Sequence, residues 1–222
     1  MNKQKVNESS IEEAVKVLKN GGTVIFPTDT VYGLGTSFTS LDGIENIYKI
    51  KKRDISKPLI ALISDVKYLE KLIDFRFRDI KEIQKIIEKY WPGELTIVFR
   101  VNENIPKNAI SDGNTIGVRI PKNEISLKII ENSGGIVFTT SANISGESSP
   151  RKIEDISSEV LEHVDLVLDN GNLNNGIPST IIKYVDGVLE VLREGNIRKE
   201  EVLNLFRRVE DRWREKQQIQ IQ

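Results

Sequence analysis

The sequence contains no cysteine and only one histidine, His163, among its 222 residues. The absence of cysteine excludes disulfide bonds, thiol nucleophiles and thiolate metal sites, and one imidazole leaves almost no nitrogen ligand for a transition metal. His163 lies in "LEHVD", where we expect a side chain on a helix surface or partly buried, not a catalytic base. Any chemistry must therefore come from hydroxyls, amides, carboxylates, lysine and arginine.

Long apolar runs are also missing. No run approaches the ~20 residues that a membrane span needs, and the N-terminus "MNKQKVNESS" is polar where a signal peptide is apolar. We therefore expect a soluble cytoplasmic protein without a membrane partner. The net charge of -1 argues against binding nucleic acid through a global field, although a local basic patch stays open. A chain that is 38% hydrophobic can bury one large core, so we expect a single domain over 1–222, with 198–222 as a charged helical tail.

Helix-like and strand-like patterns alternate along the chain, which predicts an α/β (α+β) fold. Residues 9–20 carry an apolar stripe at helical spacing, with Ser9 or Ser10 as the expected cap, and 78–90 form a second pattern of this kind. Residues 179–194 indicate two strands joined by an Asp186–Gly187 turn, so the sheet should be mixed. Further strand-like runs cover 23–26, 58–63, 95–101, 115–120, 135–140 and 165–169.

Polar segments follow several of these strands. "FPTDTVYGLG" (26–35) breaks the pattern of a continuing strand, because Pro27 removes a backbone donor while Gly33 and Gly35 free the backbone. Comparable segments are "KIKKRDISKP", "TIGVRIP" with its Arg119, "TTSANISGESSP" and "REGNI". In α/β folds, ligands gather outside the carboxyl ends of strands, so we expect the site at these loops.

A basic cluster at the end of the second helix contains Lys51, Lys52, Arg53 and Lys57. Cations favour helix C-termini and most such clusters are solvated, which is one interpretation. The other is a clamp on a polyphosphate, in which lysine supplies a compact charge and arginine a bidentate fork. No GxxxxGK[ST] motif is present, so a nucleotide would be bound by another device.

The segment 139–150 carries many hydroxyls, and it is either a flexible loop with helix caps or a set of donors for phosphate and carboxylate oxygens. The absence of a GxSxG motif argues against Ser141 as a hydrolase nucleophile. Arg119 and Arg193 lie amid apolar neighbours, and each needs an anion from a structural ion pair or from a ligand. Ser179 either caps a turn or belongs to the same site.

Seven ordered segments between Gly21 and Gly195 resemble the YrdC-like family of L-threonylcarbamoyladenylate synthases: "GGTVIFPTDTVYGLG", "KKR…KPLI", "WPGELT", "VRIP", "TTSANISGESSP", "STII" and "LREG". The resemblance implies a twisted, open mixed sheet with flanking helices around a large, positively lined cavity. It also implies a nucleotidyltransferase of the short, single-domain form. This enzyme would make threonylcarbamoyl-AMP and pyrophosphate from L-threonine, bicarbonate or CO2, and ATP with Mg²⁺, without a protein-bound metal site. The product would serve tRNA threonylcarbamoyladenosine synthesis through a separate transferase, and weak binding of tRNA itself stays open.

The resemblance also implies roles for residues. The catalytic set is Lys51, Arg53, Ser141 and Asn143. ATP would contact Arg53, Lys57, Thr115, Ser141, Asn143, Ser149 and Arg193, and threonine would contact Thr30, Leu62, Arg119, Thr139 and Ser179. Lys51, Arg53 and Arg193 would screen the repulsion between a carbamate and the α-phosphate. The chain departs from the family pattern at Leu62, where many members have His, at Asp54, where they have Pro, and at Thr140, where they have Pro.

Three alternatives remain. One is a non-catalytic RNA-binding member of the same fold, although the intact Lys-x-Arg and Ser-x-Asn pairs favour the enzyme. Another is the carbamoyl-adenylate domain of hydrogenase-maturation proteins, which normally lies in a longer chain with zinc-binding cysteines. The third, a structural scaffold, would leave the polar loops without a function.

Overall fold

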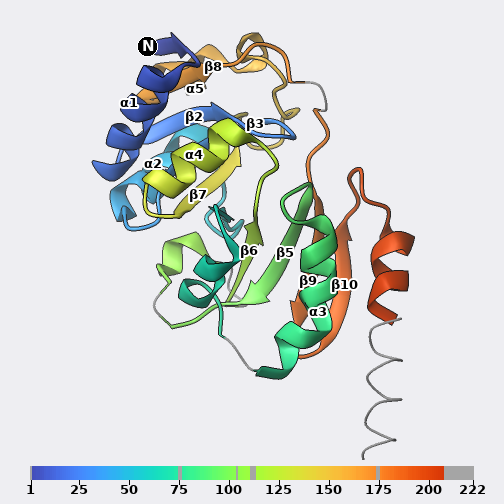
Figure 1. Cartoon of the computed structure of the whole chain (residues 1–222). Helices are drawn as coiled ribbons and strands as arrows, with labels where there is room; N and C mark the ends of the chain where they lie inside the picture. The colour runs from blue at the N-terminus through green and yellow to red at the C-terminus, as the bar shows by residue number, and fades with distance from the viewer. Residues whose placement is uncertain (1, 75–76, 104, 111–113, 174–175, 208–222) are drawn as a thin grey trace, which may run out of the picture.

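The computed structural model describes residues 2–74, 77–103, 105–110, 114–173 and 176–207, and these form one ten-stranded sheet with helices on its faces (Figure 1). The strand order is β1-β8-β2-β3-β7-β4-β6-β5-β9-β10. The strands are β1 (Lys3–Lys5), β2 (Thr23–Pro27), β3 (Tyr32–Ser37), β4 (Ile60–Ile63), β5 (Leu95–Arg100), β6 (Thr115–Arg119), β7 (Ile136–Ser141), β8 (Leu166–Asp169), β9 (Thr180–Val185) and β10 (Val188–Arg193).

The sheet is mixed, as predicted. Parallel pairs are β1–β8, β2–β8, β4–β6 and β5–β9, while the other neighbours run antiparallel. The predicted turn between β9 and β10 is confirmed, because Asp186 and Gly187 both have positive φ, 52° and 78°. Two consecutive positive φ values are what a two-residue hairpin turn of the favoured twist requires.

The stretch 26–35 corrects one prediction. Pro27 is the last residue of β2, and the chain returns after a short turn as β3, a fully buried strand that pairs antiparallel with β2. The glycines of β3 make close packing possible. A Cβ on Gly35 would approach Phe26 Cε1 and Thr139 Cγ2 to 2.9 Å each. Here glycine creates space within the sheet, not a loop.

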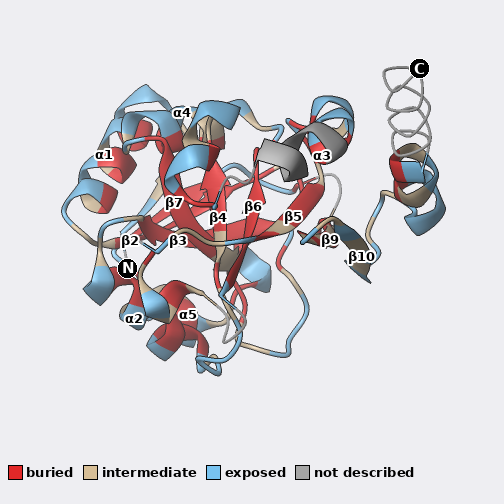
Figure 2. Cartoon of the chain, turned by 90° about the horizontal axis from the view of Figure 1, so that it is seen from below, coloured by how far each residue is buried: buried red, intermediate tan, exposed pale blue. Residues whose placement is uncertain are grey.

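Helices cover both faces of the sheet. They are α1 (Glu8–Lys19), α2 (Leu41–Lys51), α3 (Phe77–Tyr90), α4 (Glu124–Asn132) and α5 (Ser158–Glu162), with short 3-10 turns at η1 (Val66–Lys71), η2 (Lys107–Ala109) and η3 (Ile153–Asp155). Side chains of α1 and α4, such as Leu18 and Ile130, pack with Val24 of β2, whereas Ile47 of α2 packs on the opposite side with Ile25. Figure 2 shows these two layers, α1 and α4 on one side and α2 and α5 on the other, with buried strands between them.

The ends of the helices refine the sequence-based boundaries. The predicted cap of α1 at Ser9 or Ser10 is wrong, because Asn7 caps the helix and accepts from the backbone of Ser10, whose hydroxyl accepts in return from the backbone of Asn7. The second helix ends at Lys51, as expected. Residues 199–207 are helical, and the rest of the predicted tail lies outside the described residues.

Candidate active site

A cavity of about 440 Å³ opens on one face of the sheet. Successive side chains of a strand point to opposite faces, so every second residue can line it. Gly117 of β6 lies between Ile60 of β4 and Val98 of β5 in the strand register, and Ile60 in turn lies beside Thr139 of β7. The strand residues that line the cavity include Thr96, Val98, Ile60, Leu62, Gly117, Arg119, Thr139, Ser141 and Ile181.

Loops complete the wall of this cavity, which we call the chamber. The β2–β3 turn, the segment after α2, the segment after β7 and the approach to β9 all contribute, and Arg193 comes from the end of β10. Most of the residues to which the resemblance assigns a role line the chamber: Thr30, Arg53, Lys57, Leu62, Arg119, Thr139, Ser141, Ser149, Ser179 and Arg193.

Lys51 does not line the chamber. Its side chain is buried, with the residue 1% exposed, and its Nζ donates to the backbone carbonyls of Ser141 and Asn143. Burial, and next the positive charge of Arg53, lower the pKa of Lys51 to about 7, while Glu147 acts in the opposite direction. Lys51 therefore ties the end of α2 to the Ser-x-Asn segment, which makes it a brace behind the chamber wall.

Asn143 and Thr115 also lie outside the lining. Asn143 Nδ2 donates to the carbonyls of Ile144 and Glu147, at 2.9 and 2.8 Å, while its buried Oδ1 has no hydrogen-bond partner in the part of the chain that the structure describes. The amide thus holds the turn after β7 in shape. Thr115 begins β6 and pairs with Arg100, at the opposite end of that strand from Arg119. Both residues support elements of the site without facing the chamber.

Arg53 faces the chamber and stabilises its own loop. Nε donates to the carbonyl of Lys57 at 3.1 Å, and Nη2 donates to the carbonyl of Pro58 at 3.0 Å. Burial lowers the pKa of Arg53, and contact with Tyr48 opposes that shift. Within the described ranges no carboxylate forms an ion pair with Arg53, so carbonyl dipoles and the contact with Tyr48 stabilise its positive charge.

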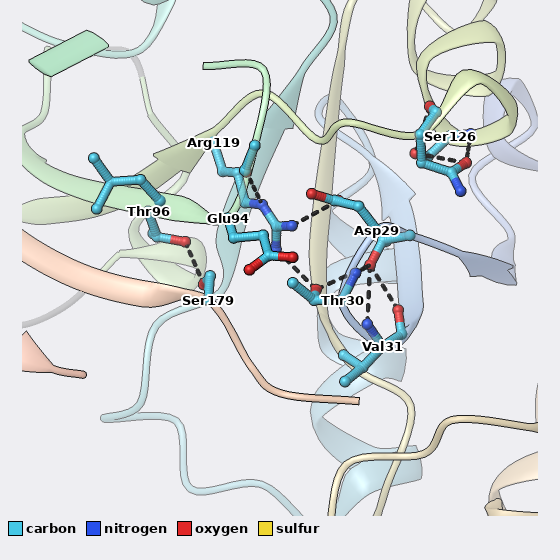
Figure 3. Close-up of polar contacts among 12 residues, drawn as sticks. Asp29, Thr30, Val31, Glu94, Thr96, Arg119, Ser126 and Ser179 are labelled. Atoms are coloured by element: carbon cyan, nitrogen blue, oxygen red, sulfur yellow. Dashed lines mark hydrogen bonds and ion pairs between the residues drawn. The ribbon is translucent and has the colours of Figure 1, made fainter. Parts of the chain in front are cut away.

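Arg193 and Ser179 form a second cationic corner. Arg193 donates to the Ser179 carbonyl from Nε at 3.1 Å and from Nη2 at 2.8 Å. Burial, and then repulsion from Arg119, lower the pKa of Arg193. Ser179 Oγ lies 2.8 Å from Thr96 Oγ1, a buried contact visible in Figure 3. Sequence reasoning missed Thr96, although a hydroxyl in the otherwise apolar run "LTIVF" was a usable signal.

Arg119 is held on three sides (Figure 3). Nε donates to the Gly93 carbonyl at 2.8 Å, Nη1 to Thr30 Oγ1 at 3.0 Å, and Nη2 to Asp29 Oδ1 at 2.6 Å. The sequence left open a structural ion pair or a ligand for this arginine. The ion pair exists, yet Arg119 still lines the chamber. The sequence showed Asp29 as the one acid among the hydroxyls of "TDT", but it was assigned no role in the site.

Other kinds of site find little support in the part of the chain that is described. No group of three or more His, Asp or Glu side chains is placed to hold a metal ion there. Likewise, no described helix combines the length and the apolar character that crossing a membrane demands. His163 ends α5 on the surface, where its Nδ1 lies 2.7 Å from the Glu159 carbonyl.

Comparison with known proteins identifies the family. The model of the Sua5/YciO/YrdC domain, described as "Telomere recombination", matches residues 16–195. The chain belongs to this family. The predicted resemblance is thereby confirmed, and so is the fold, because the solved structure of Pyrococcus abyssi Sua5 complexed with L-threonine superimposes with a TM-score of 0.82 at 31% identity, over 92% of this chain and 59% of that one.

Two curated Sua5/YciO/YrdC relatives show how the lengths differ. The putative threonylcarbamoyl-AMP synthase of Methanocaldococcus jannaschii is 38% identical over 201 residues, which cover 87% of this chain and 92% of the relative. The threonylcarbamoyl-AMP synthase of Bacillus subtilis is 32% identical over 197 residues, which cover 88% of this chain and 56% of the relative. The chain thus spans little more than half the length of some family members and nearly all of others.

Proposed function

We propose that this protein is an L-threonylcarbamoyladenylate synthase, which makes threonylcarbamoyl-AMP and pyrophosphate from L-threonine, bicarbonate or CO2, and ATP. The observation that carries the proposal is the convergence of Arg53, Arg119 and Arg193 with several hydroxyls on one chamber. Relatives that bear this enzyme's name, and the threonine complex of P. abyssi Sua5, support it.

The charge of the chamber fits the reaction. A carbamate and a nucleotide triphosphate are both anions, so the site must screen their repulsion before proximity can help. The lining that the structure describes contains three arginines and Lys57, and no Asp or Glu. With no carboxylate there to hold a metal ion, Mg²⁺ would enter as part of the ATP substrate, bound to the phosphates.

In this proposal ATP would bind at the loops after α2 and β7. Arg53, with N–H groups beyond the two that stabilise its loop, would bind the phosphates together with Lys57, Ser141 and Ser149. Arg193 would complete this grip from β10. Lys51 and Asn143 would act as positioning residues, because they shape the Ser-x-Asn segment from behind.

L-Threonine would bind at Arg119 and the residues around it. The guanidinium has five N–H groups, of which three donate to Gly93, Thr30 and Asp29. The remaining two can bind a carboxylate. Thr139 and Ser179 would contribute polar contacts, and Leu62 would contribute an apolar one.

The reaction needs neither an imidazole base nor a thiol. A carbamate oxygen of threonine attacks the α-phosphorus of ATP, and the bond to the β-phosphate oxygen breaks as pyrophosphate departs. Arg53 and Arg193 would neutralise the charge that develops on the leaving group. The product would then pass to a tRNA-modifying transferase in the cytoplasm.

The test is threonine-dependent release of pyrophosphate from ATP in bicarbonate buffer. Arg53→Ala should lower the rate by about 100-fold or more, as expected for the loss of a group that binds developing charge. Arg100→Ala is the matched control, because Arg100 forms an exposed ion pair with Asp186 and does not line the chamber. Near-normal turnover of a folded Arg53→Ala protein would refute the proposal, and tight tRNA retention without turnover would favour an RNA-binding function.

A further inference from the structure

The Arg119 end of the chamber contains a buried negative charge as well as a positive one. Asp29 Oδ1 accepts from Arg119 Nη2 at 2.6 Å, and the side chains are 10% and 6% exposed. Taking a carboxylate out of water is costly unless its partners compensate. A site built only to bind an anion would leave the arginine without a negatively charged partner. The presence of Asp29 therefore does not fit a simple anion site.

Only one carboxylate oxygen of Asp29 accepts a hydrogen bond from a described residue. Oδ2 is buried and accepts no hydrogen bond among the described residues. A buried carboxylate oxygen without a donor is rare and leaves a local negative potential, because no solvent screens it. The residues on either side of Asp29 are Thr28 and Thr30, and both line the chamber. The Asp29 carboxylate thus lies next to the lining without belonging to it, since its Oδ1 contacts Arg119, which lines the chamber.

The other half of the pair offers donors. Thr30 and the Gly93 carbonyl, together with Asp29, occupy three of the five N–H groups of Arg119 and fix its plane. The two that remain suit a carboxylate. A ligand bound to them would lie close to both charges of the pair at once.

Such an arrangement suits a ligand that carries two opposite charges close together. An amino acid would place its carboxylate on Arg119 and its ammonium in the negative potential of Asp29. A plain carboxylate would keep the first contact, but Asp29 would repel it. The field of the ion pair thus distinguishes the two classes of ligand, although both fit an arginine.

We propose that Asp29 is a specificity-determining residue, which makes the Arg119 end of the chamber select a zwitterionic amino acid over a plain carboxylate. The inference rests on the proposed function, in which L-threonine binds here. Asp29 does not itself line the chamber, so it acts through Arg119 and through its field, and it is not a catalytic residue.

A purely structural role for Asp29 makes a different prediction. If the carboxylate only pinned the arginine, its loss would weaken every carboxylate ligand by the same factor. If Asp29 instead selects between ligands, its loss changes the ratio of the affinity for an amino acid to the affinity for a plain carboxylate. The ratio is therefore the quantity to measure.

The experiment compares two ligands by isothermal titration calorimetry: L-threonine and its α-hydroxy acid analogue, in which a hydroxyl replaces the ammonium. The wild-type protein should prefer threonine by about tenfold or more, because the attraction between an ammonium and a nearby, poorly solvated carboxylate is at least of that size. Asp29→Asn keeps the shape and an oxygen for Arg119 but removes the charge, so the preference should fall to about twofold. Asp186→Asn, the same change in the exposed pair with Arg100, should retain the wild-type preference.

An unchanged ratio in Asp29→Asn, or equal weakening of both ligands, would overturn the inference while leaving the proposed function intact. Failure of the wild-type protein to bind L-threonine would instead contradict the proposed function, and the inference with it. If Asp29→Asn does not fold by circular dichroism, Asp29→Ser provides the same comparison with a smaller side chain.

Discussion

The buried ammonium of Lys51 should make the stability of this protein depend on pH in the neutral to alkaline range. In the unfolded chain the pKa of Lys51 returns to its ordinary value of 10.5, whereas burial and the charge of Arg53 lower it to about 7 in the folded protein. Between these values the unfolded chain binds a proton that the folded protein has lost. Stability therefore rises with pH from about 7 to 10.5, and below pH 7 Lys51 adds no further pH dependence.

The size of the effect follows from the shift. Each pKa unit corresponds to about 1.4 kcal/mol, and integration from pH 7 to pH 9 gives a gain of about 2 kcal/mol. Lys51→Met removes the titrating group while keeping most of the chain length. The difference in unfolding free energy, wild type minus Lys51→Met, should therefore increase by about 2 kcal/mol over this range.

Urea unfolding at pH 7 and pH 9 measures this difference. With a slope of roughly 2 kcal/mol/M, the wild-type midpoint should rise by about 1 M relative to Lys51→Met. Lys128→Met is the matched control. A hydrogen bond and an ion pair with Glu8 raise the pKa of Lys128, so it stays protonated in both states over this range and its difference should stay flat. A difference for Lys51→Met that is equal at pH 7 and pH 9 would refute the reasoning.

Two further substitutions test the chamber and the packing of α2 on the sheet. Leu62→His should increase the preference for threonine over serine by a few-fold in turnover assays, because it adds a polar contact to the threonine side; equal discrimination in both proteins would count against this role. Gly43→Ala should destabilise the protein by about 1–3 kcal/mol in thermal unfolding although alanine is the better helix former, because a Cβ there would approach Thr36 Oγ1 to 2.0 Å and the Gly21 carbonyl to 2.7 Å. Asp42→Ala, one residue earlier, should cost clearly less.

The strands that sequence patterns predict well are those with β-branched or apolar runs, such as β5, β6 and β7. β3 was not predicted because Tyr32, Gly33 and Gly35 give no strand pattern. It forms a strand only because glycine lets Phe26 and β7 approach closely. β1 was not predicted either, since Lys3–Lys5 is a short polar edge strand stabilised by pairing with β8. Tertiary context decides in both cases.

For the site, the sequence predicted which residues take part better than it predicted where their side chains point. The family motifs indicated which side chains belong to the chamber region, and most of them line it. They did not predict that Lys51 turns away onto two carbonyls or that Arg119 is paired with Asp29. A motif specifies residue types along the chain, whereas the direction of a side chain depends on neighbours from distant segments.

The order of the strands has a consequence for how the protein is made. β5 pairs with β9, so Leu95 meets Thr180, and the chamber combines Thr30 with Arg193. Pairing over such distances along the chain closes late during folding. A ribosome must therefore release the chain through Arg193 before the chamber can form, so no ligand of the chamber can stabilise the earlier segments while the chain is still being translated.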